Sequence, residues 1–250
     1  MLKKRVIPVV QLMGNTVVKT VNFMNPRQVG DATATVKVFS ARSADELVLI
    51  DIEASKYSKQ PNFDFIEFAA KNCSMPLTIG GGIDSFDTAK KIFSAGADKV
   101  LIGSLLHEKL TEVEKIATHY GQQAVVAAID CRKDKAGYIT YSSSGGEKSV
   151  SLERHFSNAV ECGAGEILLT SIDQEGLMEG FDLELIQESV ELSSLPIVVN
   201  GGAGNAQDFV ECMKFDISGV AASSVFLWEG LTIKDIKSPL RDIQIPLTNF

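Results

Sequence analysis

The chain has 250 residues, of which 45% are hydrophobic and 22% charged, a composition that excludes a disordered or low-complexity protein. Its 24 basic and 32 acidic residues give a formal net charge of −8. This balance argues against a nucleic-acid-binding surface, because neutralising many phosphates needs clustered Lys and Arg. No apolar run approaches the roughly 18 residues of a membrane span, and the N-terminus lacks a signal-peptide cleavage pattern. We therefore expect a cytoplasmic protein with no membrane partner.

Eight short apolar runs alternate with helix-like segments from one end of the chain to the other. Most of the runs are continuously apolar, as is typical of parallel strands buried on both faces. They lie at 5–10, 46–51, 76–80, 99–104, 124–130, 166–171, 196–200 and 219–223. The helix-like segments between them include 31–44, 62–72, 85–96, 110–121, 151–163 and 206–215. This count predicts an α/β fold, a (β/α)8 TIM barrel. A doubly wound open sheet is the alternative, but no GxGxxG opens a βαβ unit.

An internal repeat supports the barrel. When the chain is shifted by 120 residues, ELVLIDIEAS (46–55) aligns with EILLTSIDQE (166–175), and residues 75–106 align with 195–226 without gaps. Chance similarity rarely keeps one offset through two strand–helix units. The repeat predicts a single barrel domain over residues 1–250, built from two homologous half-barrels of about 1–120 and 121–240.

Glycine and serine residues gather where the third, fourth, seventh and eighth predicted strands end, which is the face where barrel active sites lie. Glycine-rich turns expose consecutive backbone N–H groups that suit a phosphate, and serine hydroxyls add donors. Because the repeat places two such sets across the barrel mouth, it predicts a ligand with a phosphate at each end. The alternative is that the glycines only form tight turns. The candidate phosphate-binding residues are Gly81, Gly82, Gly103, Ser104, Gly201, Gly202, Ser223 and Ser224.

Carboxylates also follow strand ends. Asp130 terminates an apolar run and is the best candidate for a general acid or base, because partial burial raises a carboxyl pKa. Its approximate repeat mate is Gln11, an amide that can orient a substrate but cannot transfer protons. Lys19 either reaches a phosphate or is a solvated loop lysine. Three further candidates for substrate contact lie at strand ends: Asp51, Ser171 and Glu175.

Four charged residues stand at the opposite ends of the predicted strands: Arg5, Glu46, Lys99 and Glu166. They could close a ring of two cations and two anions at the bottom of the barrel. Taken alone, they are better explained as rim charges exposed to water. The four cysteines and three histidines show no metal-ligand spacing, so we expect no metal and no cofactor.

The combination of KRVIP, DELVLIDIEAS, GGGI, GADKV, QAVVAAID, GAGEILLTSID, GGAG and AASSVF resembles the HisA/HisF family over nearly the whole chain. The resemblance is strongest to its HisF branch, the cyclase subunits of imidazole glycerol phosphate synthase. It implies a two-fold repeated barrel with a bisphosphorylated ligand and a HisH-like glutaminase subunit at the N-terminal rim. Ammonia would pass through the barrel, with Arg5, Glu46, Lys99 and Glu166 as its gate. Lys19, Asp51 and Asp130 match positions around the substrate, Asp130 being the general acid/base.

Two departures qualify this resemblance. Gln11 replaces the catalytic aspartate that ends the first strand in HisF, and Glu175 stands where an aspartate is usual. The stretch from Asn25 to Lys56 resembles a HisF-like branch associated with sugar amidation in surface-polysaccharide synthesis. The first hypothesis is therefore a non-cyclising subunit that passes ammonia from a glutaminase to an amidation reaction. The alternatives are a true cyclase, which makes imidazole glycerol phosphate and the aminoimidazole carboxamide ribotide, and a more remote HisA-type isomerase.

Overall fold

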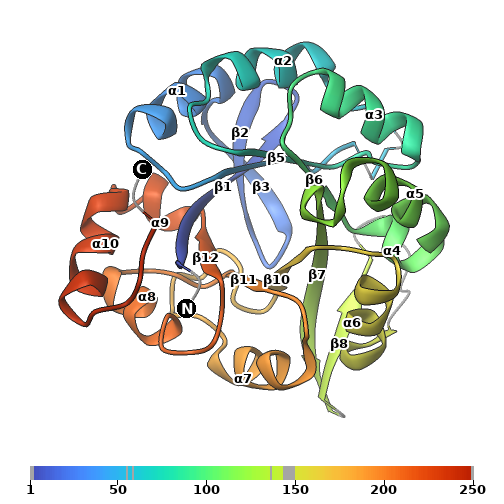
Figure 1. Cartoon of the computed structure of the whole chain (residues 1–250). Coiled ribbons are helices and arrows are strands. Elements are labelled where there is room, and N and C mark those ends of the chain that lie inside the picture. The colour runs from blue at the N-terminus through green and yellow to red at the C-terminus, as the bar shows by residue number, and fades with distance from the viewer. Residues whose placement is uncertain (1–2, 55, 58, 136, 143–149, 249–250) are drawn as a thin grey trace.

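The computed structural model describes residues 3–54, 56–57, 59–135, 137–142 and 150–248. Parallel strands close into a barrel inside a ring of helices (Figure 1), which confirms the predicted (β/α)8 architecture. Each strand pairs with the next, and the last pairs with the first. Around the barrel the order is β1 (Arg5–Met13), β4 (Leu47–Asp51), β5 (Leu77–Gly80), β6 (Lys99–Ile102), β7 (Val125–Asp134), β10 (Glu166–Ser171), β11 (Ile197–Asn200) and β12 (Gly219–Ala222).

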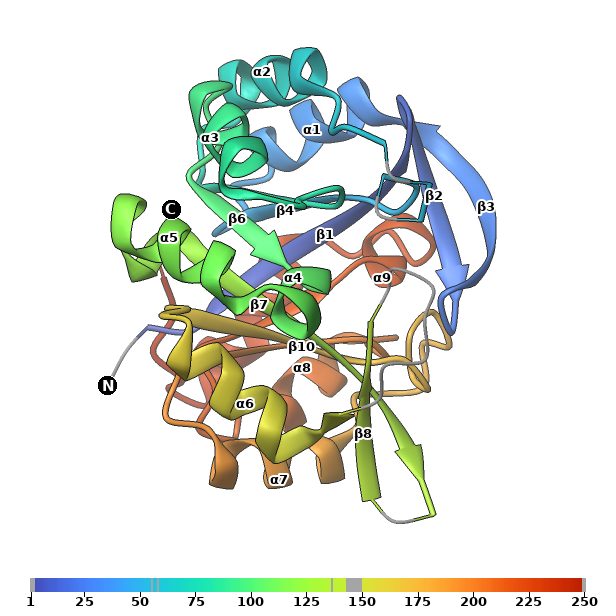
Figure 2. The same cartoon turned by 90° about the vertical axis from the view of Figure 1, so that its right-hand side faces the viewer.

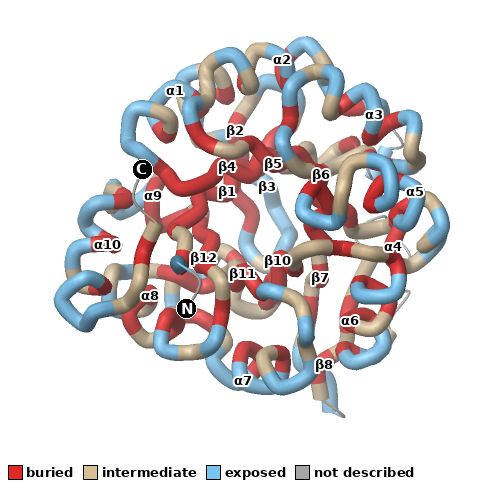
Figure 3. The backbone as a smooth tube through the Cα atoms, viewed as in Figure 1, coloured by how far each residue is buried: buried red, intermediate tan, exposed pale blue. Residues whose placement is uncertain are grey.

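The outer helices bury one face against the barrel and expose the other (Figure 3). Many begin at a residue whose side chain accepts a backbone N–H, as Ser85 does from Thr88 and Asp182 does from Leu185. Within the described residues, no helix is long and apolar enough to cross a membrane. The longer helices are α1 (Ala32–Ala41), α2 (Phe63–Asn72), α3 (Phe86–Ser94), α5 (Leu110–Tyr120), α6 (Leu152–Glu161), α7 (Leu183–Leu192), α8 (Ala206–Cys212) and α10 (Ile233–Asp242); the short ones are α4 (Ser104–Glu108), α9 (Ser224–Leu227) and the 3-10 turn η1 (Gln122–Ala124).

The inside of the barrel is filled by an apolar cluster that is separate from the larger core between strands and helices. Because side chains alternate across a strand, every second residue of each strand points inward. Inward-facing side chains therefore occur along the whole length of each strand, from the N-terminal rim of the barrel to its mouth at the C-terminal strand ends. The members of this inner cluster are Ile7, Val9, Val48, Leu101, Val126, Leu168, Val198 and Ala221.

Two hairpins that the sequence did not predict extend from the same side of the barrel (Figure 2). The first is formed by β2 (Thr16–Val21) and β3 (Met24–Asp31), and the second by the long strand β7 with β8 (Gly137–Tyr141), which also pairs with β9 (Val150–Ser151). Strand β3 is exposed along nearly its whole length, so its sequence carries no apolar alternation that would reveal a strand.

Asn22, in the turn of the first hairpin, ties that hairpin to the loop after β10. Its side-chain amide donates to the carbonyl oxygens of Ile172 (2.9 Å) and Asp173 (2.8 Å), and its backbone N–H donates to the carbonyl of Glu175 (2.8 Å). Its φ of 51° lies in the left-handed region, which asparagine tolerates better than most residues. Asn22 therefore holds the hairpin over the mouth of the barrel, because it can both form the turn and hydrogen-bond the loop after β10.

Replacing Asn22 with alanine should lower the free energy of unfolding by about 1–2 kcal/mol, because two part-buried hydrogen bonds are lost, although the Ile172 carbonyl still accepts from the Glu175 N–H at 3.3 Å. Urea titration measures this change. Asn25 is the matched control, since it has a φ of 50° but an exposed side chain. An Asn22→Ala loss no larger than that of Asn25→Ala would contradict the anchoring role.

Candidate functional site

A cavity of about 380 Å³ opens at the C-terminal ends of the strands, within the usual size range of small-molecule sites. Its floor is formed by Val9, Leu101 and Leu168 of the inner cluster, so it reaches down to the apolar core of the barrel. The structure therefore brings predicted residues from both half-barrels to one hollow. Those that line it are Gln11, Asp51, Gly81, Gly103, Ser104 and Asp130.

Asp130 lies in a row of polar side chains on three neighbouring strands. The strand register pairs Thr170 with Asp130 on one side and with Asn200 on the other. The Thr170 hydroxyl hydrogen-bonds the Asp130 carboxyl and accepts from the Asn200 amide at 3.3 Å. Burial raises the pKa of Asp130 to about 7, the nearby charge of Glu175 adds to the rise, and the Thr170 hydrogen bond opposes it. Asp130 can therefore exchange a proton near neutral pH.

The raised pKa of Asp130 predicts a pH-dependent stability. The folded protein holds a proton that the unfolded chain releases, so Asp130 lowers stability progressively as pH rises from about 4 to 7. Replacing Asp130 with asparagine should remove this penalty, and the variant's advantage should be about 2.7 kcal/mol larger at pH 8 than at pH 5. Urea unfolding at both values measures it, with Asp134→Asn, an exposed position of the same strand, as control. An advantage independent of pH would contradict the assignment.

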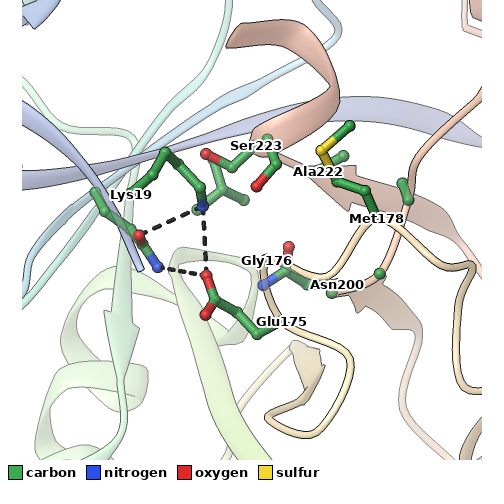
Figure 4. A pocket seen from close by; sticks show the side chains of 13 residues that line it. Lys19, Glu175, Gly176, Met178, Asn200, Ala222 and Ser223 are labelled. Atoms are coloured by element: carbon green, nitrogen blue, oxygen red, sulfur yellow. Dashed lines mark hydrogen bonds and ion pairs between the residues drawn. The ribbon is translucent and has the colours of Figure 1, made fainter. Parts of the chain in front are cut away.

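A second, smaller pocket of about 20 Å³ lies beside the first, at the ends of β11 and β12 (Figure 4). The predicted phosphate residues of the second half-barrel line it: Gly201, Gly202, Ser223 and Ser224. Gln11, Lys19 and Glu175 line it too. Lys19 is on strand β2 of the first hairpin and is 5% exposed, which excludes the alternative of a solvated loop lysine.

Glu175 is the centre of the hydrogen bonds in this pocket. Its Oε1 accepts from Thr20 Oγ1 at 2.9 Å, from Gln11 Nε2 at 3.3 Å and from Lys19 Nζ at 3.3 Å, while Oε2 accepts from the Phe23 N–H at 3.1 Å. Burial lowers the pKa of Lys19, and the Glu175 carboxylate counteracts it. Position 11, where the resemblance implies an acid, is thus an amide that donates to the carboxylate of Glu175 in the loop after β10. Thr20 is a member of this network that the sequence did not reveal.

The first glycines of the two sets have matching conformations, whereas the second ones, Gly82 and Gly202, have φ values of 69° and 107°. Gly81 has a φ of 96° and Gly201 a φ of 97°. A Cβ on Gly81 would lie 2.1 Å from the carbonyl oxygen of Asp51, so a side chain there cannot be accommodated. At the neighbouring strand ends, the hydroxyls of Ser104 and Ser223 are buried and have no hydrogen-bond partner among the described residues. Both glycine–serine sets therefore offer an unused hydroxyl donor to a ligand.

Three predicted substrate residues have other surroundings than expected. Asp51 lines the large cavity, but its Oδ1 accepts the N–H groups of Glu53 (2.9 Å) and Ala54 (3.0 Å), and burial raises its pKa. Ser171 lines neither pocket: its hydroxyl donates to Asp182 at 3.2 Å on the helix side of the barrel. Thr170 instead of Ser171 faces the cavity, as does Asn200. Gly82 lies beside the wall of the large cavity but is not among its lining residues.

At the opposite end of the barrel the four charged residues form a closed ring. Arg5 bonds Glu46 at 2.9 Å and pairs with Glu166 through both guanidinium nitrogens, while Lys99 bonds Glu46 at 2.9 Å and Glu166 at 3.2 Å. Their side chains are only 4–18% exposed, so they are not rim charges spread in water. Burial opposes ionisation of Glu166, but Arg5 and Lys99 outweigh it and lower its pKa.

Two hydroxyl residues that the sequence did not reveal hold the ring in place. Thr78 donates to Glu46 Oε1 at 2.6 Å, and Ser218 contacts both Arg5 and Glu166 at 3.2 Å. Val9 is on the floor of the large cavity, and Arg5 lies four residues before it on the same strand. The distance between the two residues along the strand is therefore about 13 Å. An apolar segment of the barrel interior therefore separates the charged ring from the mouth.

Comparison with known proteins agrees with this geometry. The family model described as "Histidine biosynthesis protein" matches residues 5–232. The chain is 40% identical over 235 residues, 92% of each chain, to the putative imidazole glycerol phosphate synthase subunit HisF of Leptospira interrogans. It is 37% identical to a putative subunit hisF2 of Pseudomonas aeruginosa, over 92% of this chain and 93% of that one, and 37% identical to the HisF subunit of Streptococcus mutans, over 97% and 98%. The chain therefore belongs to the HisA/HisF family of histidine biosynthesis proteins.

Proposed function

We propose that this chain is a HisF-like subunit of a glutamine amidotransferase that does not cyclise its ligand. It receives ammonia from a HisH-like glutaminase at the N-terminal rim, passes it through the barrel and delivers it at the mouth. The amidation it serves is that of a nucleotide sugar in surface-polysaccharide synthesis, as the likeness of residues 25–56 to that branch suggests.

The observation that carries this proposal is that residue 11 is a glutamine, whose amide hydrogen-bonds Glu175. Two-carboxylate catalysis needs a second group that can exchange protons opposite Asp130. Gln11 cannot do so, and the oxygens of Glu175, the nearest acid, already accept from Thr20, Gln11, Lys19 and Phe23. Asp130, with a pKa near neutrality, and Asp51 are both acids that line the large cavity, but neither stands at position 11. This arrangement supports ligand binding better than ring closure.

The charged ring supports the first part of the route. A neutral ammonia molecule crosses an apolar interior at little cost, whereas an ammonium ion pays a large desolvation penalty. A ring of alternating charges can accept ammonium from an adjoining active site and release its proton before the apolar segment. Arg5, Glu46, Lys99 and Glu166 are the groups that would act as this gate.

A true cyclase is the alternative, and Asp130 favours it. A carboxyl with a pKa of about 7 suits general acid/base catalysis, and the curated relatives carry the name of the synthase. Under this alternative, ammonia and the bisphosphorylated ribulosylamino-carboxamide would yield imidazole glycerol phosphate, with another group serving in place of an acid at position 11.

Co-expression with a HisH-like glutaminase tests the proposal. We expect the two chains to co-purify and the complex to hydrolyse glutamine at least ten-fold faster than the glutaminase alone. Lys99→Met should reduce the transfer of ammonia to the acceptor and leave the complex intact, and Lys115→Met, on an exposed helix face, is the matched control. The absence of any complex or of any stimulation would contradict the proposal.

A further inference from the structure

Helix α6 is joined to two neighbouring elements by a buried histidine. His155 is 0% exposed, and the centroid of its ring lies 4.2 Å from that of His107 on α4. Its Nδ1 lies 2.8 Å from the hydroxyl oxygen of Thr140 on β8. Asn158, one turn further along α6, donates its side-chain amide to the carbonyl of Leu106 on α4 at 3.3 Å. The three elements lie side by side (Figure 1).

Both neighbours of α6 lead to the large cavity. Helix α4 begins at Ser104, and strand β8 ends at Tyr141, directly before Ser142. Ser104 and Ser142 both line the cavity. A movement of α6 away from α4 and β8 would therefore release two segments of the mouth at once.

The hydrogen bonds of Thr140 determine which ring nitrogen of His155 carries the proton. The Thr140 hydroxyl donates its one hydrogen to the carbonyl of Val150 at 3.1 Å, so towards His155 it can only accept. Nδ1 of His155 is therefore the protonated nitrogen, and Nε2 carries a lone pair. Nε2 is buried and has no hydrogen-bond partner among the described residues. A proton taken up at Nε2 would thus form a buried N–H group without an acceptor, which is costly.

The surroundings of His155 also oppose a positive charge. Burial lowers its pKa to about 3, and the charge of His107 adds to the decrease. Helix α6 packs against β7, β9 and α7 as well as α4 and β8. Two titratable groups on these strands are buried, Cys131 and Tyr138, and both stay neutral because burial raises their pKa values. Strand β9 has no titratable side chain.

The charged groups on the same elements have other surroundings. Asp130 and Arg132 are on the cavity side of β7, since side chains alternate along a strand. Asp182, at the N-terminus of α7, accepts from the Tyr138 hydroxyl at 2.8 Å. The remaining ones are exposed on the surface: Glu108, Lys133, Asp134, Glu153, Arg154, Glu161, Glu184, Glu188 and Glu191. The charge that acts on His155 is therefore that of His107.

We propose that His155 is an acid-sensitive fastening of the mouth. When Nε2 takes up a proton from solvent, α6 separates locally from α4 and β8, and the cavity wall at Ser104 and Ser142 loses its support. At neutral pH the neutral ring holds the three elements together. This device goes beyond the proposed function, because it acts on the mouth whatever the ligand and whether or not a glutaminase is bound.

The direction of the pH effect follows from the lowered pKa of His155. An unfolded histidine has a pKa of about 6.5, and the folded value lies well below it. The stability that needs a neutral ring is therefore complete above about pH 6.5 and is lost as pH falls towards the folded pKa. Because the unfolded chain takes up one more proton, His155 should reduce the folding constant about ten-fold between pH 7.5 and 5.5.

Urea unfolding of the wild type and of His155→Asn at these two pH values measures the effect. Asparagine does not titrate, but it has an amide that can donate to Thr140. Relative to the variant, the wild-type folding constant should be about ten-fold lower at pH 5.5 than at pH 7.5, and the contribution of Asp130 cancels because both chains contain it. His119→Asn, at an exposed position, is the matched control and should keep a constant ratio to the wild type. A constant ratio for His155→Asn would overturn the proposal.

Hydrogen exchange followed by mass spectrometry locates the release. Relative to His155→Asn and after correction for intrinsic rates, wild-type peptides from α6 and β8 should lose about ten-fold in protection between pH 7.5 and 5.5. Peptides from α1, on the other side of the barrel in Figure 1, should lose less than about two-fold. An equal loss in α1, or no loss in α6, would show that no local release takes place and would also overturn the proposal.

Nuclear magnetic resonance of the imidazole nitrogens in the wild type gives a test that needs no variant to fold. The chain has 3 histidines, so each ring can be followed separately. One ring should have a protonated Nδ1 and an unprotonated Nε2 throughout pH 7.5 to 5.5 in the folded protein. The absence of a ring in this form, or protonation of all the rings of the folded chain within that range, would contradict the proposal.

Discussion

Arg5→Ala should lower the free energy of unfolding by about 3 kcal/mol near pH 7. Removing one member of a buried ion pair typically costs about 3–5 kcal/mol, because the remaining charge stays buried without its partner. Here Glu166 would lose both guanidinium contacts and Glu46 one, while Lys99 still bridges them. Because the Arg5 side chain is still 18% exposed, we expect the loss of stability to lie at the lower end of the range of about 3–5 kcal/mol.

Urea unfolding measures this loss, and its pH dependence identifies its cause. In the wild type the pKa of Glu166 is lowered, so the stabilisation by the pair is present above the unfolded pKa and is lost as pH falls through the folded one. The penalty of Arg5→Ala should therefore shrink below about pH 4, where an unfolded glutamate is protonated. Lys71→Ala, which removes an exposed pair with Glu67, is the control and should cost less than about 1 kcal/mol. A pH-independent loss would show that Arg5 acts through packing alone.

Gln11→Glu should lower stability by about 2 kcal/mol at pH 8. The two side chains have the same shape, so the change replaces an amide that donates to Glu175 Oε1 at 3.3 Å with a carboxylate oxygen at that distance. Two carboxylates this close cannot both ionise cheaply, and one of them will have a raised pKa. The loss is therefore expected at high pH and should diminish as pH falls and the pair takes up a proton.

The exchanged double variant Gln11→Glu/Glu175→Gln is the sharpest control. It keeps one amide and one carboxylate in contact beside Lys19 and should recover at least half of the lost stability. A double-mutant cycle from urea unfolding gives the coupling energy of the two positions. No recovery in the double variant would show that the two residues do not act as a pair.

The barrel was predictable because its signals are local. Each buried strand is a short apolar run, and the positions of Asp130 and Gly81 at the mouth follow from where those runs stop, although β7 itself continues to Asp134. Alternation could also have placed Thr170 in the cavity: it shares its face with Glu166 and Leu168, whereas Ser171 is on the other face. The exposed strand β3 has no such alternation, so the hairpin over the mouth could not be recognised.

The contacts that decide the chemistry are long-range. Gln11 and Glu175 are 164 residues apart, and nothing in either segment indicates that they touch. The burial of Lys19 depends on that hairpin and on the same carboxylate. The charged ring was predicted only through the family resemblance, since charges at strand starts are usually solvated. Thr78 and Ser218, which orient the ring, carry no signal of their own.

The most direct test of the proposed function is an assay of the purified chain with ammonium and the bisphosphorylated ribulosylamino-carboxamide, in which imidazole glycerol phosphate is measured. A mouth with an amide in place of an acid at position 11 should give no product above the level of the Asp130→Asn variant. Steady formation of imidazole glycerol phosphate that Asp130→Asn abolishes would contradict the account and establish the chain as a cyclase.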